Sequence, residues 1–475
     1  SWDVGTRTAD TSSAARARQT KRLPSVLVTT PESLSLLLTY PDAREKFAGL
    51  RCVVCDEWHE LFGSKRGVLT ELALARLRGF VPDLRTWGLS ATLGNLADAL
   101  AALVGASNSG RVIRGHVPKP VAIDAVAPQR VDRFPWAGHL GLSLLPQVLG
   151  ALDEVKSALL FTNTRSSCET WYQAILEAKP EWAGQVALHH GSLDRKARDW
   201  VEDGLRTGKL RCVVCTSTLD LGVDFAPVER VLQVGSPKGV ARLLQRAGRS
   251  GHRPGAPSRV TCVPTHAFEL VEVAAARTAA AAGAIEGRDV VEKPLDVLAQ
   301  HCVSSALGGG FRADELFAEV RTARAYRDLT ADEWGWVLDF VTRGGEALKA
   351  YPDYRRVEVR DGIYAVTDAK MARRHRLSIG TITSEASVLV RFLRGPKLGM
   401  VDEGFAARLK RGDRFTFAGR TLEFVRLYEM TVWVKVARQE ADTKLRWSGS
   451  RLPLSGELSA AVRAKLDDAR RGLFA

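Results

Sequence analysis

The fold is decided by the stretch Arg51-Cys-Val-Val-Cys-Asp-Glu-Trp-His59. A short apolar run up to Cys55 is typical of a buried strand in a parallel sheet, and an acidic pair follows it directly. Ligands of parallel α/β sheets bind at the carboxyl ends of the strands, so this strand would deliver Asp56 and Glu57 to the ligand-binding edge. The stretch therefore predicts an α/β domain with a site that uses two carboxylates.

The residues around this stretch alternate between short apolar runs and helical patterns. Such alternation predicts a mostly parallel sheet covered by helices. In the first series we expect strands at Val26–Val28, Arg51–Cys55 and Trp87–Thr92, and helices at Ser33–Leu38 and Val68–Arg78. A second series predicts a second α/β domain, with strands at Ala158–Phe161, Val186–His189, Cys212–Cys215 and Val231–Val234.

The rest of the chain has different patterns. An Ala-rich segment, residues 267–287, predicts a connecting helix. Three amphipathic helices and a β-hairpin with a glycine turn then predict a winged helix, from patterns at Leu295–Leu307, Asp314–Tyr326, Ala331–Arg343 and Arg356–Arg360. Short β-rich runs indicate a small barrel or sandwich, and a basic amphipathic helix is expected at Glu457–Arg471. We therefore expect four domains, at residues 1–118, 119–288, 289–372 and 373–475.

Composition narrows the class of protein. The 68 Lys and Arg residues against 54 Asp and Glu residues give a net charge of +14, which favours a polyanionic partner such as nucleic acid, although a basic surface can also serve solubility alone. The sequence has no apolar run of about 18 residues and no signal-peptide pattern, so we expect a soluble, cytoplasmic protein without a membrane partner.

Two cysteine pairs, Cys52 with Cys55 and Cys212 with Cys215, have the spacing of zinc ligands. Both pairs lie in predicted strands, where residues three apart point to opposite faces. We therefore expect these cysteines to be core residues. The His189-His190-Gly191 segment is not expected to hold a metal either, because no carboxylate or cysteine accompanies it at ligand spacing.

The acidic pair suits ATP chemistry. An Asp at this position can hold Mg²⁺ through its waters, and the adjacent Glu can orient and deprotonate the water that attacks the γ-phosphate. An Asp-Glu pair also caps helices, so it carries little weight alone. It gains weight because other polar segments follow the strands in order: Thr30-Pro31-Glu32, Ser90-Ala91-Thr92, Phe161–Arg165, Thr216, Gly222-Val-Asp224 and Gln245–His252.

Together these segments resemble motifs Ib, II, III, IV, V and VI of superfamily 2 helicases, over residues 24–256. The amino-acid sequence is similar to that of Lhr-like helicases, especially the ligase-associated DEXH-box group, in Val28–Leu38, Asp56–Gly67 and Gly235–Gly239. The resemblance implies two RecA-like domains followed by a winged-helix domain and a β-rich, barrel-like domain. It also implies an ATP-dependent DNA helicase.

The resemblance implies a role for each matching residue. Asp56 would hold Mg²⁺, Glu57 would be the general base, His59 and Gln245 would link the nucleotide to the domain interface, and Arg249 would be an arginine finger. The remaining ATP contacts would be Gly222, Asp224, Arg246 and His252, which stands at the position of a family arginine. Ser90, Ala91 and Thr92 would couple the nucleotide site to the strand-binding surface. Contacts with the tracking strand would come from Thr30, Pro31, Glu32, Thr162, Asn163, Arg165, His190, Gly191 and Thr216.

Two further features bear on function. The family places a Gly-rich loop ending in Gly-Lys-Thr or Gly-Lys-Ser before motif Ib, where its amides and Lys bind ATP phosphates. No such sequence occurs in this chain, so we expect the first RecA-like domain to be truncated and unable to turn over ATP alone. In the β-rich region, Trp447 lies among cations and either stacks on an unpaired base or packs on its own barrel.

The sequence thus predicts a DNA-dependent ATPase that uses ATP and Mg²⁺ and moves 3′ to 5′ along single-stranded DNA, unwinding a duplex or an RNA–DNA hybrid. A role in repair, with a DNA ligase or nuclease as partner, is implied only by the ligase-associated resemblance. Two alternatives stay open. One is a Ski2-like RNA helicase with the same motif set, and the other is a nucleic-acid-binding module without catalysis.

Overall fold

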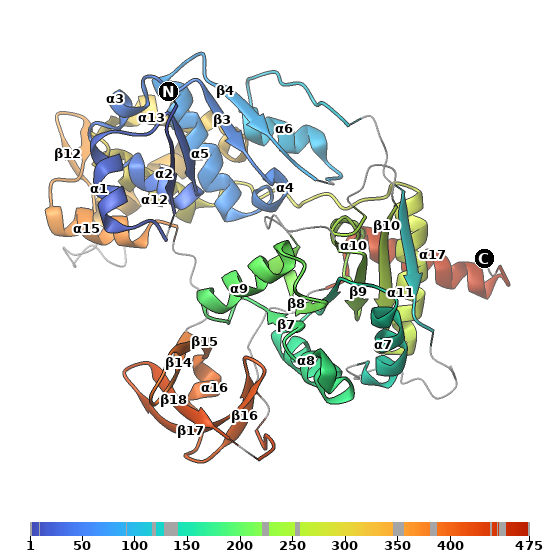
Figure 1. Cartoon of the computed structure of the whole chain (residues 1–475). Helices are drawn as coiled ribbons and strands as arrows, with labels where there is room; N and C mark the ends of the chain where they lie inside the picture. The colour runs from blue at the N-terminus through green and yellow to red at the C-terminus, as the bar shows by residue number, and fades with distance from the viewer. Residues whose placement is uncertain are drawn as a thin grey trace. The chain divides into compact units, whose positions relative to one another are not determined.

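The computed structural model describes residues 2–8, 10–91, 93–115, 120–127, 141–220, 228–251, 257–344, 356–380, 387–437, 439–443, 445 and 453–473. The chain forms two compact units, each built from two separate stretches of sequence. Unit 1 contains residues 1–114 and 287–383, and unit 2 contains residues 115–286 and 384–475 (Figure 1). Each unit therefore combines one α/β region with one later module.

The α/β region of unit 1 contains two pairs of parallel strands. β1 (Val4–Arg7) pairs with β2 (Val26–Thr29), and β3 (Cys52–Cys55) pairs with β4 (Arg85–Gly88). The helices are α1 (Ser13–Lys21), α2 (Pro31–Leu37), α3 (Ala43–Phe47), α4 (Trp58–Leu61), α5 (Lys65–Phe80) and α6 (Leu96–Val104).

The strand prediction needs two corrections here. The strand predicted at Trp87–Thr92 lies earlier, in β4, because pairing with β3 ends where the Leu89 amide donates to the Cys55 carbonyl. The strand predicted as buried is covered on one face only, since Val54 in β3 is 52% exposed while Cys55 is buried.

The later part of unit 1 has the helices and the small antiparallel sheet of a winged helix, with strand order β11-β13-β12. Its turn places Asp361 and Gly362 at φ values of 51° and 76°, as a tight hairpin requires. The helix predicted to end at Tyr326 ends at Arg321 and gives way to a 3₁₀ turn. The elements are α12 (Leu295–Leu307), β11 (Phe311–Arg312), α13 (Ala313–Arg321), η5 (Arg324–Tyr326), α14 (Ala331–Arg343), β12 (Glu358–Arg360), β13 (Ile363–Ala365) and α15 (Ala369–Ser378).

Helix α5 joins the two parts of unit 1. Its Val68 and Leu72 pack in one hydrophobic core with winged-helix residues such as Leu298 and Val320. Other faces of α5 pack in two more cores of the α/β region. The helix is apolar on several sides because it is buried on several sides.

A buried carboxyl group of α5 binds the winged-helix part of unit 1 within this shared core. Glu71 of α5 is 4% exposed, and its Oε2 accepts a hydrogen bond from the Ala325 amide at 2.9 Å. Burial raises the pKa of Glu71 from 4.5 to about 7. Nearby, Arg324 pairs with Asp98 at 2.7 Å. The winged helix is thus held to the α/β region by polar contacts as well as by apolar packing.

Unit 2 is built on a parallel sheet whose six described strands have the order β5-β10-β9-β6-β8-β7 (Figure 1). Alternate residues of β6 serve two cores, one with α7 and α8 and the other with α9, α10, α11 and α17. The strands are β5 (Val121–Ala125), β6 (Ala158–Phe161), β7 (Val186–His189), β8 (Cys212–Cys215), β9 (Arg230–Val234) and β10 (Ser258–Val263). The helices are η2 (Leu142–Leu144), α7 (Leu145–Asp153), α8 (Arg165–Ala178), η3 (Pro180–Trp182), α9 (Arg195–Arg206), η4 (Ser217–Leu219), α10 (Val240–Ala247), α11 (Ala267–Ala281) and α17 (Gly456–Arg470).

The second cysteine pair lies where strand geometry predicts, whereas in the first pair Cys55 is buried and Cys52 is only partly buried. Cys212 packs in one core of unit 2 and Cys215 in the other, so the two thiols lie on opposite faces of the sheet. All seven cysteines of the chain fall within the described residues and carry free thiols.

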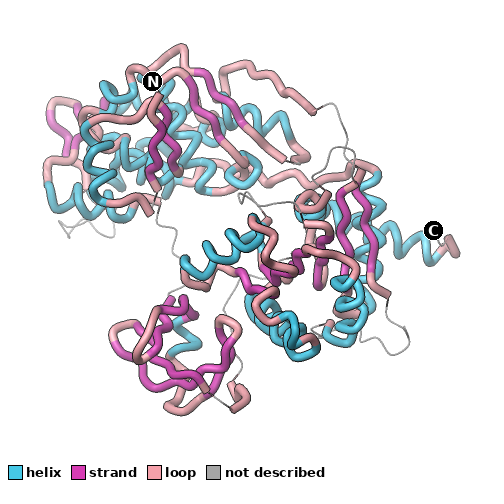
Figure 2. Tube along the Cα trace, in the orientation of Figure 1, coloured by secondary structure: helices cyan, strands magenta, loops and turns pink. Residues whose placement is uncertain are grey.

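The second part of unit 2 is a curled half-barrel of short strands, visible as the magenta tubes of residues 387–436 in Figure 2. Its described strands have the order β15-β14-β18-β17-β16, and phenylalanines such as Phe415 and Phe417 fill its core. The elements are β14 (Ser387–Phe392), β15 (Lys397–Asp402), α16 (Glu403–Ala406), β16 (Arg414–Phe417), β17 (Arg420–Tyr428) and β18 (Thr431–Val436). None of the described helices combines the length and apolarity needed to cross a membrane.

Glu71 makes the stability of unit 1 depend on pH. The raised pKa means that folded Glu71 holds a proton that the unfolded chain releases, so its contribution is present below about pH 4.5 and is lost as the pH rises through about 7. We expect thermal melts to show a loss of about 3 kcal/mol over this range. Glu71→Gln should flatten that dependence, and the exposed control Glu315→Gln should not. Equal pH dependence in the original chain and in Glu71→Gln would contradict this.

Candidate functional site

The acidic pair follows β3 at a sharp turn. Glu57 has a left-handed backbone with φ of 48°, a conformation that residues other than glycine adopt mainly where the surrounding structure enforces it. The Asp56 carboxylate accepts from the Glu57 amide at 2.9 Å, and the Trp58 indole donates to the Ala99 carbonyl at 2.8 Å. Asp56 is exposed and Glu57 is partly exposed. Both carboxylates are therefore presented to solvent from a fixed turn.

His59 joins this turn to the loop after β4. Its side chain is 1% exposed, and its Nδ1 accepts a hydrogen bond from the Ala91 amide at 3.3 Å. Burial lowers the pKa of His59, so the ring is neutral near pH 7 and carries its proton on Nε2, which lies 3.6 Å from Glu60. The structure thus brings Asp56, Glu57, His59, Ser90 and Ala91 together, while Thr92 lies outside the described residues.

A segment from beyond the α/β region also contacts this turn. The Arg288 guanidinium pairs with Glu60 at 3.0 Å, and its backbone exchanges two hydrogen bonds with the Asn95 side chain at 2.9 and 3.0 Å. Sequence reasoning missed Arg288 and Asn95, because contacts over 193 residues leave no local pattern.

Thr30, Pro31 and Glu32 begin helix α2. Thr30 caps the helix by accepting from the Ser33 amide, and Pro31 occupies the first turn. Glu32 pairs with Arg66 at 2.6 Å. Burial alone would raise the pKa of Glu32, but hydrogen bonds from Arg66, the backbone and Thr30, together with the charge of Arg66, outweigh it and lower the pKa, so the carboxylate is charged. A charged carboxylate repels phosphate, and the residue that offers a cation here is Arg66, which the sequence did not single out.

In unit 2, the predicted strand contacts lie at the carboxyl ends of β6, β7 and β8. Arg165 and Gly191 are exposed there. Thr162 is fully buried, and its hydroxyl donates to the Thr164 carbonyl at 3.1 Å. Thr162 therefore shapes the loop through its hydroxyl, and its predicted contact with a strand phosphate stays a prediction.

Asn163 and Thr216 lie at the same edge. The Asn163 amide donates to the Ser236 carbonyl at 2.6 Å, and Thr216, which is 9% exposed, donates its backbone N–H to the His189 carbonyl at 3.2 Å. Asn163 thus connects the end of β6 to the loop after β9, and Thr216 connects the end of β8 to the end of β7.

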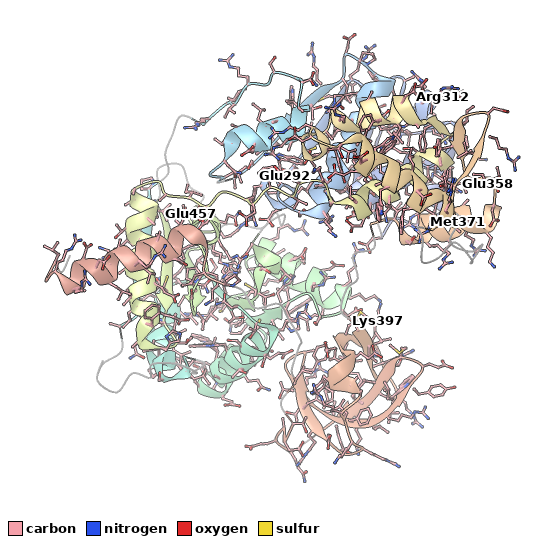
Figure 3. The ribbon with its side chains drawn as sticks, turned by 180° about the vertical axis from the view of Figure 1, so that it is seen from behind. Glu292, Arg312, Glu358, Met371, Lys397 and Glu457 are labelled. Carbon is pink, nitrogen blue, oxygen red and sulfur yellow. The ribbon has the colours of Figure 1, made fainter. Side chains whose placement is uncertain are left out.

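His190 is also buried, and it is held by a carboxylate that reaches the half-barrel. Its Nε2 lies 3.2 Å from Glu169, whose two oxygens also accept from the Ala418 and Gly419 amides at 2.7 and 2.8 Å. Lys397, labelled in Figure 3, projects from β15 and pairs with Asp194 at 3.3 Å. The loop after β7 is thus tied to the half-barrel within unit 2.

Arg246 is used inside the domain. Its side chain is 2% exposed, and its guanidinium binds Asp220 through two hydrogen bonds, of 2.8 and 3.2 Å, and also donates to Gln233. A guanidinium held in this way stabilises the packing of α10 on β9, and the predicted contact of Arg246 with ATP stays a prediction. Gln245 and Arg249 are partly exposed.

Glu286 caps the helix that carries these residues. Gly239 gives α10 no side-chain cap, and instead Glu286 accepts from the amide of Ala241 at 2.6 Å and from the Ser455 hydroxyl at 2.7 Å. Burial would raise the pKa of Glu286, but these donors lower it overall. Sequence reasoning missed Glu286, which lies two residues before Arg288 in the chain.

Besides Thr92, four predicted residues lie outside the described part of the chain: Gly222, Asp224, His252 and Trp447. Their roles stay predictions. Among the described residues, no group of three or more His, Cys, Asp or Glu side chains could hold a metal ion by itself. A metal at Asp56 would therefore depend on water and on ligands from a bound molecule, which is how Mg²⁺ is commonly held.

Three family models match the chain. The DEAD/DEAH box helicase model matches residues 3–99, the helicase conserved C-terminal domain matches 142–254, and the winged helix domain of the large helicase-related protein matches 278–444. The last match covers both the winged helix and the half-barrel strands.

Curated relatives agree with these matches. ATP-dependent helicase Lhr-Core of Sulfolobus acidocaldarius is 32% identical over 98% of this chain and 54% of its own length. Lhr helicase/uracil glycosylase of Escherichia coli K12 is 34% identical over 71% of this chain and 25% of its own length. The chain spans about half the length of the Lhr-Core relatives it matches.

Solved structures have the same fold. The structure of Mycobacterium smegmatis helicase Lhr bound to ssDNA and AMP-PNP is 30% identical, with a TM-score of 0.72, over 81% of this chain and 50% of that one. DUF1998 helicase MrfA bound to DNA, at 19% identity and a TM-score of 0.74 over 92% of this chain and 61% of that one, supports the fold alone. Over the matched residues the chain is similar to the Lhr-like helicases of superfamily 2.

Proposed function

We propose that this chain supplies most of the motor of an ATP-dependent DNA helicase, which moves 3′ to 5′ along one strand and unwinds a duplex or an RNA–DNA hybrid. The observation that carries the proposal is the hydrogen bond from the Ala91 amide to His59. It joins the acidic turn after β3 to the loop after β4, so a change at the nucleotide can reach a neighbouring loop through one side chain.

The residues after β3 suit ATP hydrolysis. Asp56 would hold Mg²⁺ through waters, since hard oxygen ligands are those that Mg²⁺ prefers. Glu57 would orient the attacking water and take its proton. Arg249 would stabilise charge on the transferring phosphoryl group. These 475 residues contain no Gly-Lys-Thr or Gly-Lys-Ser sequence, so we infer that hydrolysis needs a phosphate-binding loop in addition to them.

The strand ends suit a nucleic-acid backbone. Thr30, Arg165 and Gly191 lie at or just after the carboxyl ends of their strands, where hydroxyl, guanidinium and backbone donors can hold phosphates without reading sequence. The ssDNA in the related mycobacterial structure supports DNA over RNA as the partner. A repair role with a ligase or nuclease rests only on the resemblance to the ligase-associated group.

The general base can be tested in a chain that also carries the family's phosphate-binding loop. Glu57→Gln removes the proton acceptor but keeps the side-chain size, so DNA-stimulated ATP hydrolysis should fall by about 10²- to 10⁴-fold. Binding of ATP and of single-stranded DNA, measured in parallel, should change little. The exposed control Glu45→Gln should leave hydrolysis unchanged. Loss of nucleotide or strand binding in Glu57→Gln would indicate a structural role instead.

The strand partner can be tested in the chain as it stands. Matched DNA and RNA oligonucleotides, followed by fluorescence anisotropy, should show binding of single-stranded DNA. Arg165→Ala should weaken it about fivefold, equivalent to about 1 kcal/mol. The control is Lys209→Ala, because Lys209 lies before β8, at the amino end of that strand. Binding of RNA alone would favour the Ski2-like alternative. No binding of either would contradict the proposed motor.

A further inference from the structure

One face of the half-barrel has no role in the proposed function. Arg391 of β14 lies beside Trp433 of β18 in the register of these parallel strands, and Arg426 of β17 lies beside Trp433 on its other side. Neighbouring residues such as Val390, Val432 and Val434 point into the barrel core. Since side chains alternate along a strand, Arg391 and Trp433 point outward.

The three side chains make a layered stack. The Cζ atom of Arg391 lies 5.5 Å from the centroid of the Trp433 ring, and that of Arg426 lies 5.8 Å from it. Arg426 also lies 5.6 Å from the Tyr428 ring, and Tyr428 is 55% exposed. We name Arg391, Arg426, Tyr428 and Trp433 the Trp433 face.

The two guanidinium groups on this face are not neutralised by the protein. Within the described parts of the chain, neither has a carboxylate within 4.0 Å, and the Arg391 guanidinium donates a hydrogen bond to the Gly395 carbonyl at 3.4 Å. The neighbouring cation Lys435 differs, since it pairs with Glu423 at 2.9 Å.

The packing of two arginines on Trp433 contributes little to the stability of the half-barrel. An exposed cation–π contact contributes about 0.5 to 1 kcal/mol, while two like charges beside one ring repel each other. An anion that contacts both guanidinium groups removes that repulsion. Guanidinium binds phosphate through two parallel hydrogen bonds, and an exposed aromatic ring stacks on unpaired bases.

We propose that the Trp433 face is a second binding surface for single-stranded nucleic acid, separate from the strand ends of the α/β regions. Trp433 holds the two guanidinium groups, which bind consecutive phosphates, and Tyr428 stacks on a base. This proposal rests on the proposed function, because the Trp433 face would add a second contact between the same motor and a single strand. A duplex would not fit it, since its bases are already stacked.

The test compares charge and stacking in the chain as it stands, with an oligothymidylate as the probe. The double variant Arg391→Ala/Arg426→Ala should lower the slope of log affinity against log salt by about 1.4, because each lost phosphate contact on a single strand removes about 0.7. Tyr428→Ala should weaken binding at least about fivefold with the salt slope unchanged, since it removes stacking alone.

The matched control is Arg408→Ala/Arg411→Ala, which removes the same charge from exposed residues of the same domain. Its salt slope should stay that of the unaltered chain. A fall as large as that of the Arg391/Arg426 variant would overturn the proposal, since it would reflect net charge only. An unchanged slope in the Arg391/Arg426 variant, with thermal melting also unchanged, would overturn it too while leaving the proposed function in place. No binding by the unaltered chain would overturn both.

Discussion

The candidate site depends on parallel strand pairing. In unit 1, Cys55 pairs with Gly88, so the chain leaves both strands at the same edge and Ala91 can reach His59. In unit 2, pairing of β6 and β7 with β8 brings three strand ends to one edge in the same way. A slip of one residue would turn alternate side chains to the wrong face and separate these ends. The register therefore positions the residues of both the proposed nucleotide site and the proposed strand contacts.

The later modules are parts of the two units and are not merely tethered to them. Helix α5, which begins after the acidic turn, shares its core with the winged helix, and Glu169 binds both His190 and the half-barrel. Each module therefore moves with the α/β region on which it packs. The chain passes from one unit to the other three times. At the boundary between residues 286 and 287, Glu286 binds the start of α10 in unit 2, and Arg288 binds Glu60 and Asn95 in unit 1.

The sequence predicted the features that have a local signal. Helix α12 and helix α14 have the predicted bounds because their apolar spacing is regular, and the Asp361-Gly362 turn follows from the residues themselves. Features that depend on distant partners were missed or misplaced. The burial of Arg246 depends on Asp220 and Gln233, and the contact of Arg288 with Asn95 spans 193 residues. Such contacts leave no periodicity to detect.

In the proposed function, the strand ends of each α/β region contact single-stranded nucleic acid. Hydrogen exchange of the chain, with and without a single-stranded DNA oligonucleotide, tests this directly because it reports each backbone amide. Exchange should slow in the segments after β2, β6, β7 and β8, around Thr30, Arg165, Gly191 and Thr216. Protection confined to other segments, such as helix α17, or no protection under conditions in which the DNA is bound, would contradict it.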